Sequence, residues 1–317
     1  MKRKLRFNHT KKISYCPYWG DGKKERGTMQ KKTTIIGCGD IGLRVSSLYR
    51  KENQLVRGFV RSRESLDKCL HKQIEAYQFD MDFQSSKTLA VEKHDLYYFA
   101  PPPVSGDKDR RLQKFLEQLS TIPRKIVLIS TTGVYGDCAA EWIDETQQAK
   151  PKADRAKRRF HAEQSLQAWS SDNKVAWVIL RVPGIYALDR LPLARIKKGT
   201  PMVRGEEAGW TNRIHADDLA MIAKAVMQDP NADGQIYNAC DGNPSVMTHY
   251  FDQVADYANL PRPPKITMAE AEKQLSSGIL SYLKESRKIS NRKLLQELKI
   301  TLKYPDLMSC LGTYSKK

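Results

Sequence analysis

The sequence predicts an α/β fold built on a doubly wound parallel sheet. Three observations lead to this prediction. Short apolar segments alternate with helix-like segments between residues 33 and 135. The apolar segments are short and continuous, which is typical of parallel strands buried on both faces. The first of them runs directly into a glycine-rich turn and an apolar-periodic segment, a strand–turn–helix order that belongs to this fold.

The predicted elements follow in chain order. Strands are predicted at residues 33–36, 55–60, 76–79, 95–100 and 125–130, with further strands at 176–182 and 235–238. Helices are predicted near residues 41–51, 62–72, 83–92 and 107–120, and a further helix starts at 217–219 with Asp217 as its expected cap. Ligands of a Rossmann-type sheet bind outside the carboxyl ends of its strands, so the residues that follow the strands are the candidates for a site.

The glycine-rich turn, with the sequence TTIIGCGDIG at residues 33–42, predicts a dinucleotide site. Gly37 would let the chain turn sharply, Gly39 would leave the backbone open to a diphosphate, and Gly42 would let the helix pack close to the strand. The helix then starts at Asp40 and Ile41, where free N–H groups favour phosphate. The alternative is a glycine-rich turn without a ligand.

Later strand ends supply the other candidate cofactor contacts. Arg61 follows the second strand, where an Asp or Glu would hold the ribose of NAD, and an arginine suits the 2′-phosphate of NADP. We therefore expect NADP, with NAD as the alternative. Arg61 could also be a solvated arginine that starts the next helix and binds no cofactor. Asp80 could accept from the adenine amino group or cap a helix. Ala100 and Pro101 begin a stiff loop that would wall the cofactor.

Composition limits the function classes. The chain has 317 residues, 40% hydrophobic and 28% charged, with a net charge of +18. Residues 1–28 hold nine Lys or Arg against two Asp or Glu, and we read them as a disordered basic arm or an upstream start site. The remaining excess of positive charge accompanies no recognisable nucleic-acid motif, so we expect no nucleic-acid partner.

No apolar run approaches the roughly 20 residues that span a bilayer, and we expect no membrane partner. The six cysteines are scattered without a C-x-x-C pair. This pattern predicts neither a metal site nor a disulfide framework, and it suits a reducing cytoplasm.

Several segments together resemble the extended short-chain dehydrogenase/reductase superfamily, which includes nucleotide-sugar epimerases and dehydratases. They are the glycine-rich turn, STTGVYG at 130–136, RVPGIY at 181–186 and NRIHADDLA at 212–220. The likeness spans about residues 31–310, and a later segment, GQIYN at 234–238, is similar to the atypical YeeZ-like subgroup. The resemblance implies a Rossmann-type NAD(P)-binding domain with a small substrate lobe.

The resemblance also assigns catalytic positions. Thr131 falls at the catalytic Ser/Thr of the superfamily, although a threonine that simply ends a strand is equally compatible. The Tyr-x-x-x-Lys pair of the superfamily is missing, because none of the 14 tyrosines has a lysine four residues later. Arg155 aligns with the tyrosine and Arg159 with the lysine.

Helical geometry gives these arginines a direction. At about 100° per residue, Arg155, Arg158 and Arg159 share one arc that continues into Ala162 and Leu166, so they should face the sheet. Arg159 could bridge ribose hydroxyls. Arg155 cannot act as an acid or base, but it could clamp an anionic substrate. The alternative is a basic helix start that binds phosphate or solvent.

The sequence therefore predicts an NAD(P)-dependent enzyme of oxidoreductase or epimerase/dehydratase type with an atypical active site and a small, anionic substrate. A non-catalytic NADP(H)-sensing regulatory protein is the alternative, favoured by the missing tyrosine. We expect residues 29–185, with 214–240 returning, to form the cofactor domain. Residues 186–213 and 241–317 would form a mainly helical substrate lobe.

Overall fold

The central element is a seven-stranded sheet in which every pairing is parallel. The structure is a computed structural model, and it describes residues 32–82 and 88–312. The strands of the sheet, in spatial order, are β12 (Gln235–Asn238), β7 (Ala176–Val182), β5 (Lys125–Thr131), β4 (Asp95–Tyr98), β1 (Thr33–Ile36), β2 (Val56–Val60) and β3 (Glu75–Gln78). The predicted doubly wound parallel sheet is confirmed.

Burial explains why these segments form the sheet. All four residues of β1 and all four of β4 are buried. Successive side chains of a strand point to opposite faces, so Ile35 enters one hydrophobic core and Ile36 the other. A strand with an apolar residue at each position is stable only between two layers of helices.

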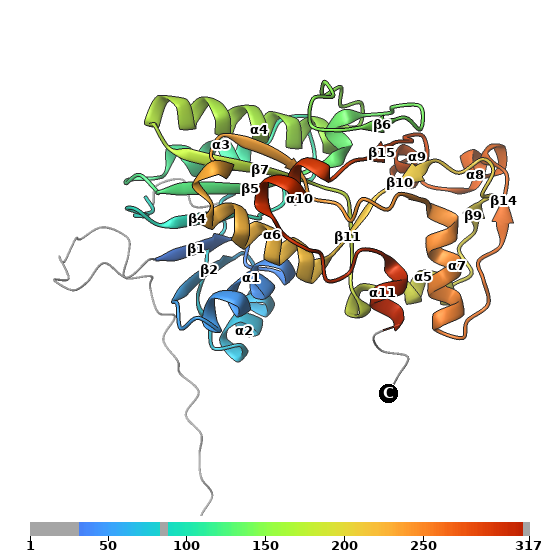
Figure 1. Cartoon of the computed structure of the whole chain (residues 1–317), viewed down its shortest axis with the longest axis horizontal. Helices are drawn as coiled ribbons and strands as arrows, with labels where there is room; N and C mark the ends of the chain where they lie inside the picture. The colour runs from blue at the N-terminus through green and yellow to red at the C-terminus, as the bar shows by residue number, and fades with distance from the viewer. Residues whose placement is uncertain (1–31, 83–87, 313–317) are drawn as a thin grey trace, which may run out of the picture.

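Helices cover both faces of the sheet (Figure 1). They are α1 (Asp40–Arg50), α2 (Arg63–His71), α3 (Arg110–Glu117), α4 (Asp154–Asn173) and α6 (Ala216–Gln228). α1 packs against α6 on one face, and α3 against α4 on the other. On α4, Ala162 and Leu166 are fully buried against the sheet, as the helical arc predicts.

Smaller elements lie beside the carboxyl ends of the strands (Figure 1). The helices are α5 (Leu193–Lys197), α7 (Met247–Tyr257), α8 (Met268–Gln274), α9 (Ser277–Leu283), α10 (Arg292–Leu298) and α11 (Leu307–Gly312). Two-stranded pairs are β6 (Trp142–Ile143) with β15 (Lys288–Ile289), β8 (Gly184–Tyr186) with β11 (Arg213–His215), β9 (Met202–Val203) with β14 (Lys265–Ile266), and β10 (Trp210–Thr211) with β13 (Ser245–Val246). The single-turn segments are η1 (Thr132–Tyr135), η2 (Leu188–Arg190) and η3 (Pro230–Ala232).

These smaller elements have a core of their own. Tyr186, Phe251, Val254 and Leu311 belong to one buried cluster separate from the two cores of the sheet. α10 is different, because its Leu294 is buried in the sheet core beside β12. The chain therefore returns to the sheet edge after it has built most of this lobe.

Two helix predictions are corrected. The helix expected near 83–92 is not found at residues 88–92, where Leu89 instead forms an isolated bridge to Leu119; residues 83–87 lie outside the described residues. The helix expected at 107–120 is shorter, because the Asp109 side chain caps it by accepting from the N–H groups of Arg111 and Leu112. The arm at 1–28 also lies outside the described residues.

The cap predicted for α6 is a different residue. His215 precedes the helix, and its Nδ1 accepts from the N–H of Asp217 at 3.1 Å. Asp217, expected as the cap, lies inside the first turn and pairs with Arg44. A histidine is an unusual cap, so the sequence pattern favoured the neighbouring aspartate.

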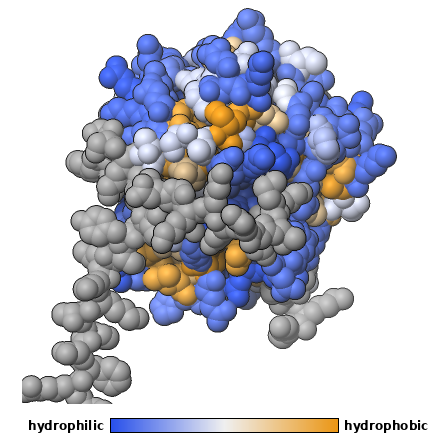
Figure 2. Space-filling view, turned by 90° about the vertical axis from the view of Figure 1, so that its left-hand side faces the viewer, coloured by the Kyte–Doolittle hydropathy of each residue, from blue (hydrophilic) through white to orange (hydrophobic). Residues whose placement is uncertain are grey.

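Figure 2 views the molecule from the end of the sheet at which β1 begins. The coloured surface there is mostly hydrophilic, with separate hydrophobic areas. Leu55 and Ile122, which precede β2 and β5, are among the exposed apolar residues of the chain. Within the described residues, no helix combines the length and apolar character needed to cross a membrane.

Buried histidine makes stability depend on pH. His94 is 7% exposed, its Nδ1 lies 2.8 Å from Thr34 Oγ1, and burial lowers its pKa to about 4. Between pH 6.5 and 4 the unfolded chain binds more protons at this side chain than the folded chain does. The free energy of unfolding therefore decreases as the pH is lowered through this range. The full effect is about 3 kcal/mol.

We expect His94→Gln to flatten this dependence relative to the wild type. Urea unfolding followed by circular dichroism between pH 4.5 and 7.5 measures it. His71→Gln is the control, because His71 is exposed and should leave the slope unchanged. Equal slopes for wild type and His94→Gln would contradict the assignment.

Candidate functional site

A cavity of about 310 Å³ lies at the carboxyl ends of the central strands. It is lined by Ile36, Gly37, Gly39, Phe59, Val60, Arg61, Ser62, Ser65, Phe79, Asp80, Met81, Phe99, Ala100, Pro101 and Arg111. These residues follow β1, β2, β3 and β4, which the sheet order places side by side. Six of the nine residues predicted to bind a cofactor therefore meet at one cavity.

The first turn is fixed by close backbone contacts. Gly37 has φ +80°, and a Cβ at this position would lie 2.5 Å from the backbone nitrogen of Ala100. Its own N–H donates to Phe59 O at 2.8 Å. The turn after β1 thus contacts the end of β2 and the loop after β4, and only glycine has both the conformation and the space that this contact requires.

Gly39 faces open space instead. A Cβ there would meet nothing closer than 4.0 Å, and the residue is exposed. Gly39 is also the residue before α1, and among the described residues no side chain caps this helix start. The first N–H groups of α1 are therefore available to a ligand, and their partial positive charge favours an anion.

The other three residues predicted at this turn do not line the cavity. Ile41 is buried in the sheet core. A Cβ on Gly42 would lie 3.1 Å from Ile35, so Gly42 allows the close helix–strand packing. Asp40 points its carboxylate away to two arginines, Arg44 at 3.0 Å and Arg190 at 2.6 Å.

Arg44 ties the start of α1 to the rest of the molecule. Its guanidinium also pairs with Asp189 at 2.9 Å and Asp217 at 2.5 Å. Burial opposes its charge, but the hydrogen bond to Asp217 and the charge of Asp40 outweigh burial and raise the pKa of Arg44. This network offsets the negative charge of Asp40 beside the open helix start.

The end of β2 presents a free cation. Arg61 is exposed and lines the cavity, and among the described residues its guanidinium makes no ion pair. Ser62 begins α2, and its Oγ accepts from the N–H of Ser65. One guanidinium and two hydroxyl groups therefore line this cavity, and the Ser62 O–H donates to Ser65 Oγ at 2.9 Å.

Arg111 is a lining residue that the sequence analysis missed. It comes from α3, yet its guanidinium binds Asp82 through two nitrogens, at 2.9 and 2.5 Å, and donates to Pro101 O. This bond lowers the pKa of Asp82. Asp80, predicted to contact adenine, lines the cavity and accepts from the N–H of Asp82. The doublet Arg110-Arg111, at the start of the helix that follows the proline loop, was the available signal.

Thr131 ends β5 and does not line the cavity. Its Oγ1 accepts from the N–H of Gly133 at 3.2 Å, which leaves its own O–H free to donate. Behind it, Ser130 donates to Glu163, which also pairs with Arg181 at 2.8 Å. Both charged groups are nearly fully buried, so this pair fixes α4 against β5 and β7.

The two arginines of α4 lie in different surroundings. Arg159 donates to Ala100 O at 3.2 Å, next to the cavity wall, and burial lowers its pKa. Arg155 turns to the smaller lobe: it donates to Ser281 and stacks on the Tyr282 ring at 3.5 Å. Sequence geometry alone could not find this contact, because its partners lie more than 120 residues later.

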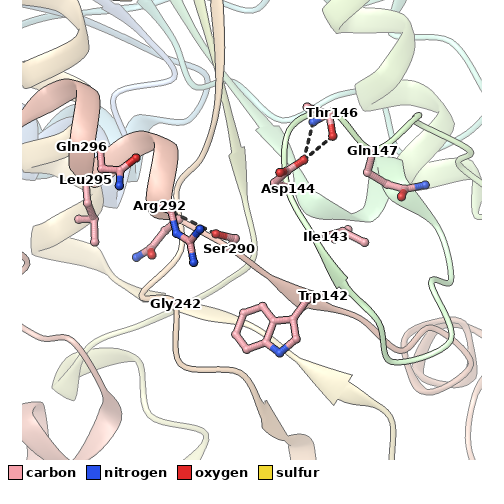
Figure 3. A pocket seen from close by; sticks show the side chains of 11 residues that line it. Trp142, Ile143, Asp144, Thr146, Gln147, Gly242, Ser290, Arg292, Leu295 and Gln296 are labelled. Carbon is pink, nitrogen blue, oxygen red and sulfur yellow. Dashed lines mark hydrogen bonds between the residues drawn. The ribbon is translucent and has the colours of Figure 1, made fainter.

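A larger cavity, of about 880 Å³, lies between residues 142–147 and the start of α10. Figure 3 shows the Trp142 ring on one side of it, with Arg292 and Asp144 nearby. None of the residues predicted for the site lines this cavity. Among the described residues, no group of three His, Cys, Asp or Glu side chains could hold a metal ion.

Comparison with known proteins identifies related sequences and folds. The sequence profile of the NAD dependent epimerase/dehydratase family matches residues 111–240, which include β5, α4, β7 and β12. No curated protein sequence matches the chain. A functionally unknown conserved protein from Silicibacter pomeroyi is 24% identical, with 89% of this chain and 97% of that chain covered and a TM-score of 0.73.

Two further structures of similar fold are described as epimerases or dehydratases. A protein from Methylobacillus flagellatus, provisionally described as a NAD-dependent epimerase/dehydratase, is 25% identical over 90% of this chain and 97% of that chain, with a TM-score of 0.64. UDP-glucuronic acid 4-epimerase from Bacillus cereus, in complex with UDP-glucuronic acid and NAD, is 15% identical over 89% and 96%, with a TM-score of 0.68. The chain therefore has the Rossmann-like fold of epimerase structures.

The two glycines of the turn should respond differently to substitution. Gly37→Ala should lower the melting temperature, because the added Cβ collides with backbone and the positive φ is strained. Gly39→Ala should melt like the wild type, because its Cβ meets open space. Differential scanning calorimetry measures both. Gly205→Ala is the control, because its Cβ would make only an ordinary contact of 3.8 Å with His249, away from the cavity. Equal melting of Gly37→Ala and wild type would contradict the contact.

Proposed function

We propose that the chain is an NAD(P)-dependent enzyme of oxidoreductase or epimerase/dehydratase type with an atypical active site. The observation that carries this proposal is the convergence of four strand ends and an uncapped helix start on one cavity. The profile match over residues 111–240 and the NAD-bound structure of similar fold support it.

The residues present fit a dinucleotide. Gly39 leaves room for a diphosphate, and the N–H groups at Asp40 and Ile41 would donate to it, whereas the Gly39 N–H already donates to Gly37 O at 2.7 Å. Asp80 would accept from the adenine amino group, while Ala100 and Pro101 wall the other side. When bound, the cofactor supplies hydride transfer, and the protein supplies position and charge.

We propose NADP rather than NAD. Arg61 makes no ion pair with a described residue, although its charge acts on Asp82, and Ser65 adds a hydroxyl donor beside it. A 2′-phosphate has the charge and the acceptor atoms to match this set, whereas an NAD site would place an acidic residue there.

The catalytic part departs from the superfamily pattern. Thr131 would donate its free O–H to a reacting oxygen, and Arg159 would hold the ribose beside Ala100. Arg155 would bind an anionic group of a small substrate, which would take over from its present contacts with Ser281, Tyr282 and the Glu285 carboxylate, 3.8 Å away. Residues 186–213 and 241–317 would form the substrate lobe.

The free cysteines and the basic residues support a proposal for the compartment and the partners of the protein. The five described cysteines are free, which suits the cytoplasm. We propose neither a nucleic-acid nor a membrane partner, because the basic residues that we assign a role serve a small anionic ligand.

Cofactor choice is tested on Arg61. Arg61→Ala should weaken NADPH binding by about tenfold or more and leave NADH binding unchanged, because only NADPH loses a charge-assisted bond. Fluorescence titration of the reduced cofactors measures both affinities. The matched control is Arg63→Ala, since Arg63 pairs with Asp67 outside the cavity. Parallel loss of both affinities would contradict the role of Arg61.

Turnover is tested with a panel of carbonyl compounds and nucleotide sugars. We expect NADPH consumption or epimerisation with at least one anionic member, and a loss of rate for Thr131→Val but not for Thr132→Val. A general acid contributes about 10²–10⁴ in rate, so a low rate is expected without the tyrosine. Tight cofactor binding without any turnover would favour the non-catalytic NADP(H) sensor instead.

A further inference from the structure

Two thiols meet beneath the glycine turn. Cys38 stands between Gly37 and Gly39, and Cys69 comes from α2. The Cys69 thiol donates to Cys38 O at 3.5 Å, and the two thiols are hydrogen-bond partners. Both side chains are buried, at 1% and 0% exposure. The cavity contacts described above use neither sulfur.

The sulfur of Cys38 is closely confined. A Cβ on Gly58 would lie 2.9 Å from both Cβ and Sγ of Cys38, and Ser46 Oγ lies 3.9 Å from this sulfur. The Cys38 thiol therefore fills the space between β2, α1 and α2, with Cys69 as the neighbouring thiol.

Few side chains anchor α2 to the sheet. Of its nine residues, only Cys69 is buried, and Leu66 packs partly buried against the sheet core. The two ion pairs on this helix, Arg63 with Asp67 and Lys68 with Glu64, are solvent-exposed and contribute little to its anchoring. An element with one buried residue opens at a low free-energy cost, and such an opening would admit a small oxidant to both thiols.

We propose that Cys38 and Cys69 form a redox-sensitive pair, in which a hydroperoxide converts the two thiols to a disulfide that staples α2 to the glycine turn. The consequence for cofactor binding rests on the proposed function. The pair is a modification site distinct from the residues that contact the ligand.

The chemistry is a two-electron oxidation. The Cys69 thiolate attacks the peroxide oxygen and forms a sulfenic acid, while the O–O bond breaks and, with one proton, yields water or an alcohol. The Cys38 thiol then attacks the sulfenic sulfur, forms the S–S bond and releases water. The bond from Cys38 lowers the pKa of Cys69, whereas the same bond and burial raise the pKa of Cys38, so Cys69 is the attacking thiol.

Oxidation should weaken dinucleotide binding. A disulfide would draw Cys38 toward α2, and its neighbour Gly37 has no room to follow without disturbing its contact with Ala100. The same bond would shift Ser65, which comes from α2 and lines the cavity. The glycine turn and Ser65, which both line the cavity, would therefore move away from their positions in the reduced chain.

The experiment uses the full chain, reduced or treated with hydrogen peroxide. Peptide mass spectrometry without reductant should find Cys38 and Cys69 linked, with the loss of two hydrogens. NADPH should bind the oxidised chain about fivefold or more weakly, and dithiothreitol should restore the affinity. Cys69→Ser should bind NADPH equally with and without peroxide. The control Cys240→Ser alters another fully buried thiol and should keep the peroxide response.

Three outcomes decide the proposal. Absence of the Cys38–Cys69 linkage in peroxide-treated, folded chain would overturn it, as would a linked chain with unchanged NADPH affinity. A wild-type response that persists in Cys69→Ser would also overturn it. If the reduced chain binds no dinucleotide, the proposed function fails, while the mass measurement still decides whether the thiols pair. If the Cys69→Ser variant does not fold, Cys69→Ala replaces it in the same binding measurement.

Discussion

The backbone contact between Gly37 and Ala100 is the constraint on which the candidate site depends. It holds the turn after β1 against the loop after β4, and the hydrogen bonds from Gly37 and Cys38 to Phe59 O add the end of β2. The ends of three adjacent parallel strands are thereby fixed relative to one another. This contact places the open N–H groups of α1 beside the proline loop that follows β4.

Most of the fold could be predicted because parallel strands need apolar residues on both faces. Each of the seven sheet strands was found within two residues of its predicted bounds. The helix near 83–92 was wrong in its described part, because Leu89 is anchored by a bridge to Leu119 rather than by a helical face. The cap of α6 was missed because His215 is an unusual acceptor at a helix start.

The candidate site was predictable only where it follows the strand ends. Gly37, Arg61 and Asp80 come from positions that the sheet order brings together, so a local reading could place them. Arg111 joins from a helix, and Arg155 is held by residues far along the chain. Such contacts depend on tertiary packing, which a pattern within one segment does not contain.

The central claim is that the open helix start at Gly39 receives the diphosphate of a dinucleotide. A crystal structure of the chain with NADPH tests it most directly. The account predicts diphosphate oxygens within about 2.7–3.2 Å of the N–H groups at residues 40 and 41, with the 2′-phosphate beside Arg61. A dinucleotide bound instead in the cavity beside Trp142, or a glycine turn without ligand at saturating NADPH, would contradict it.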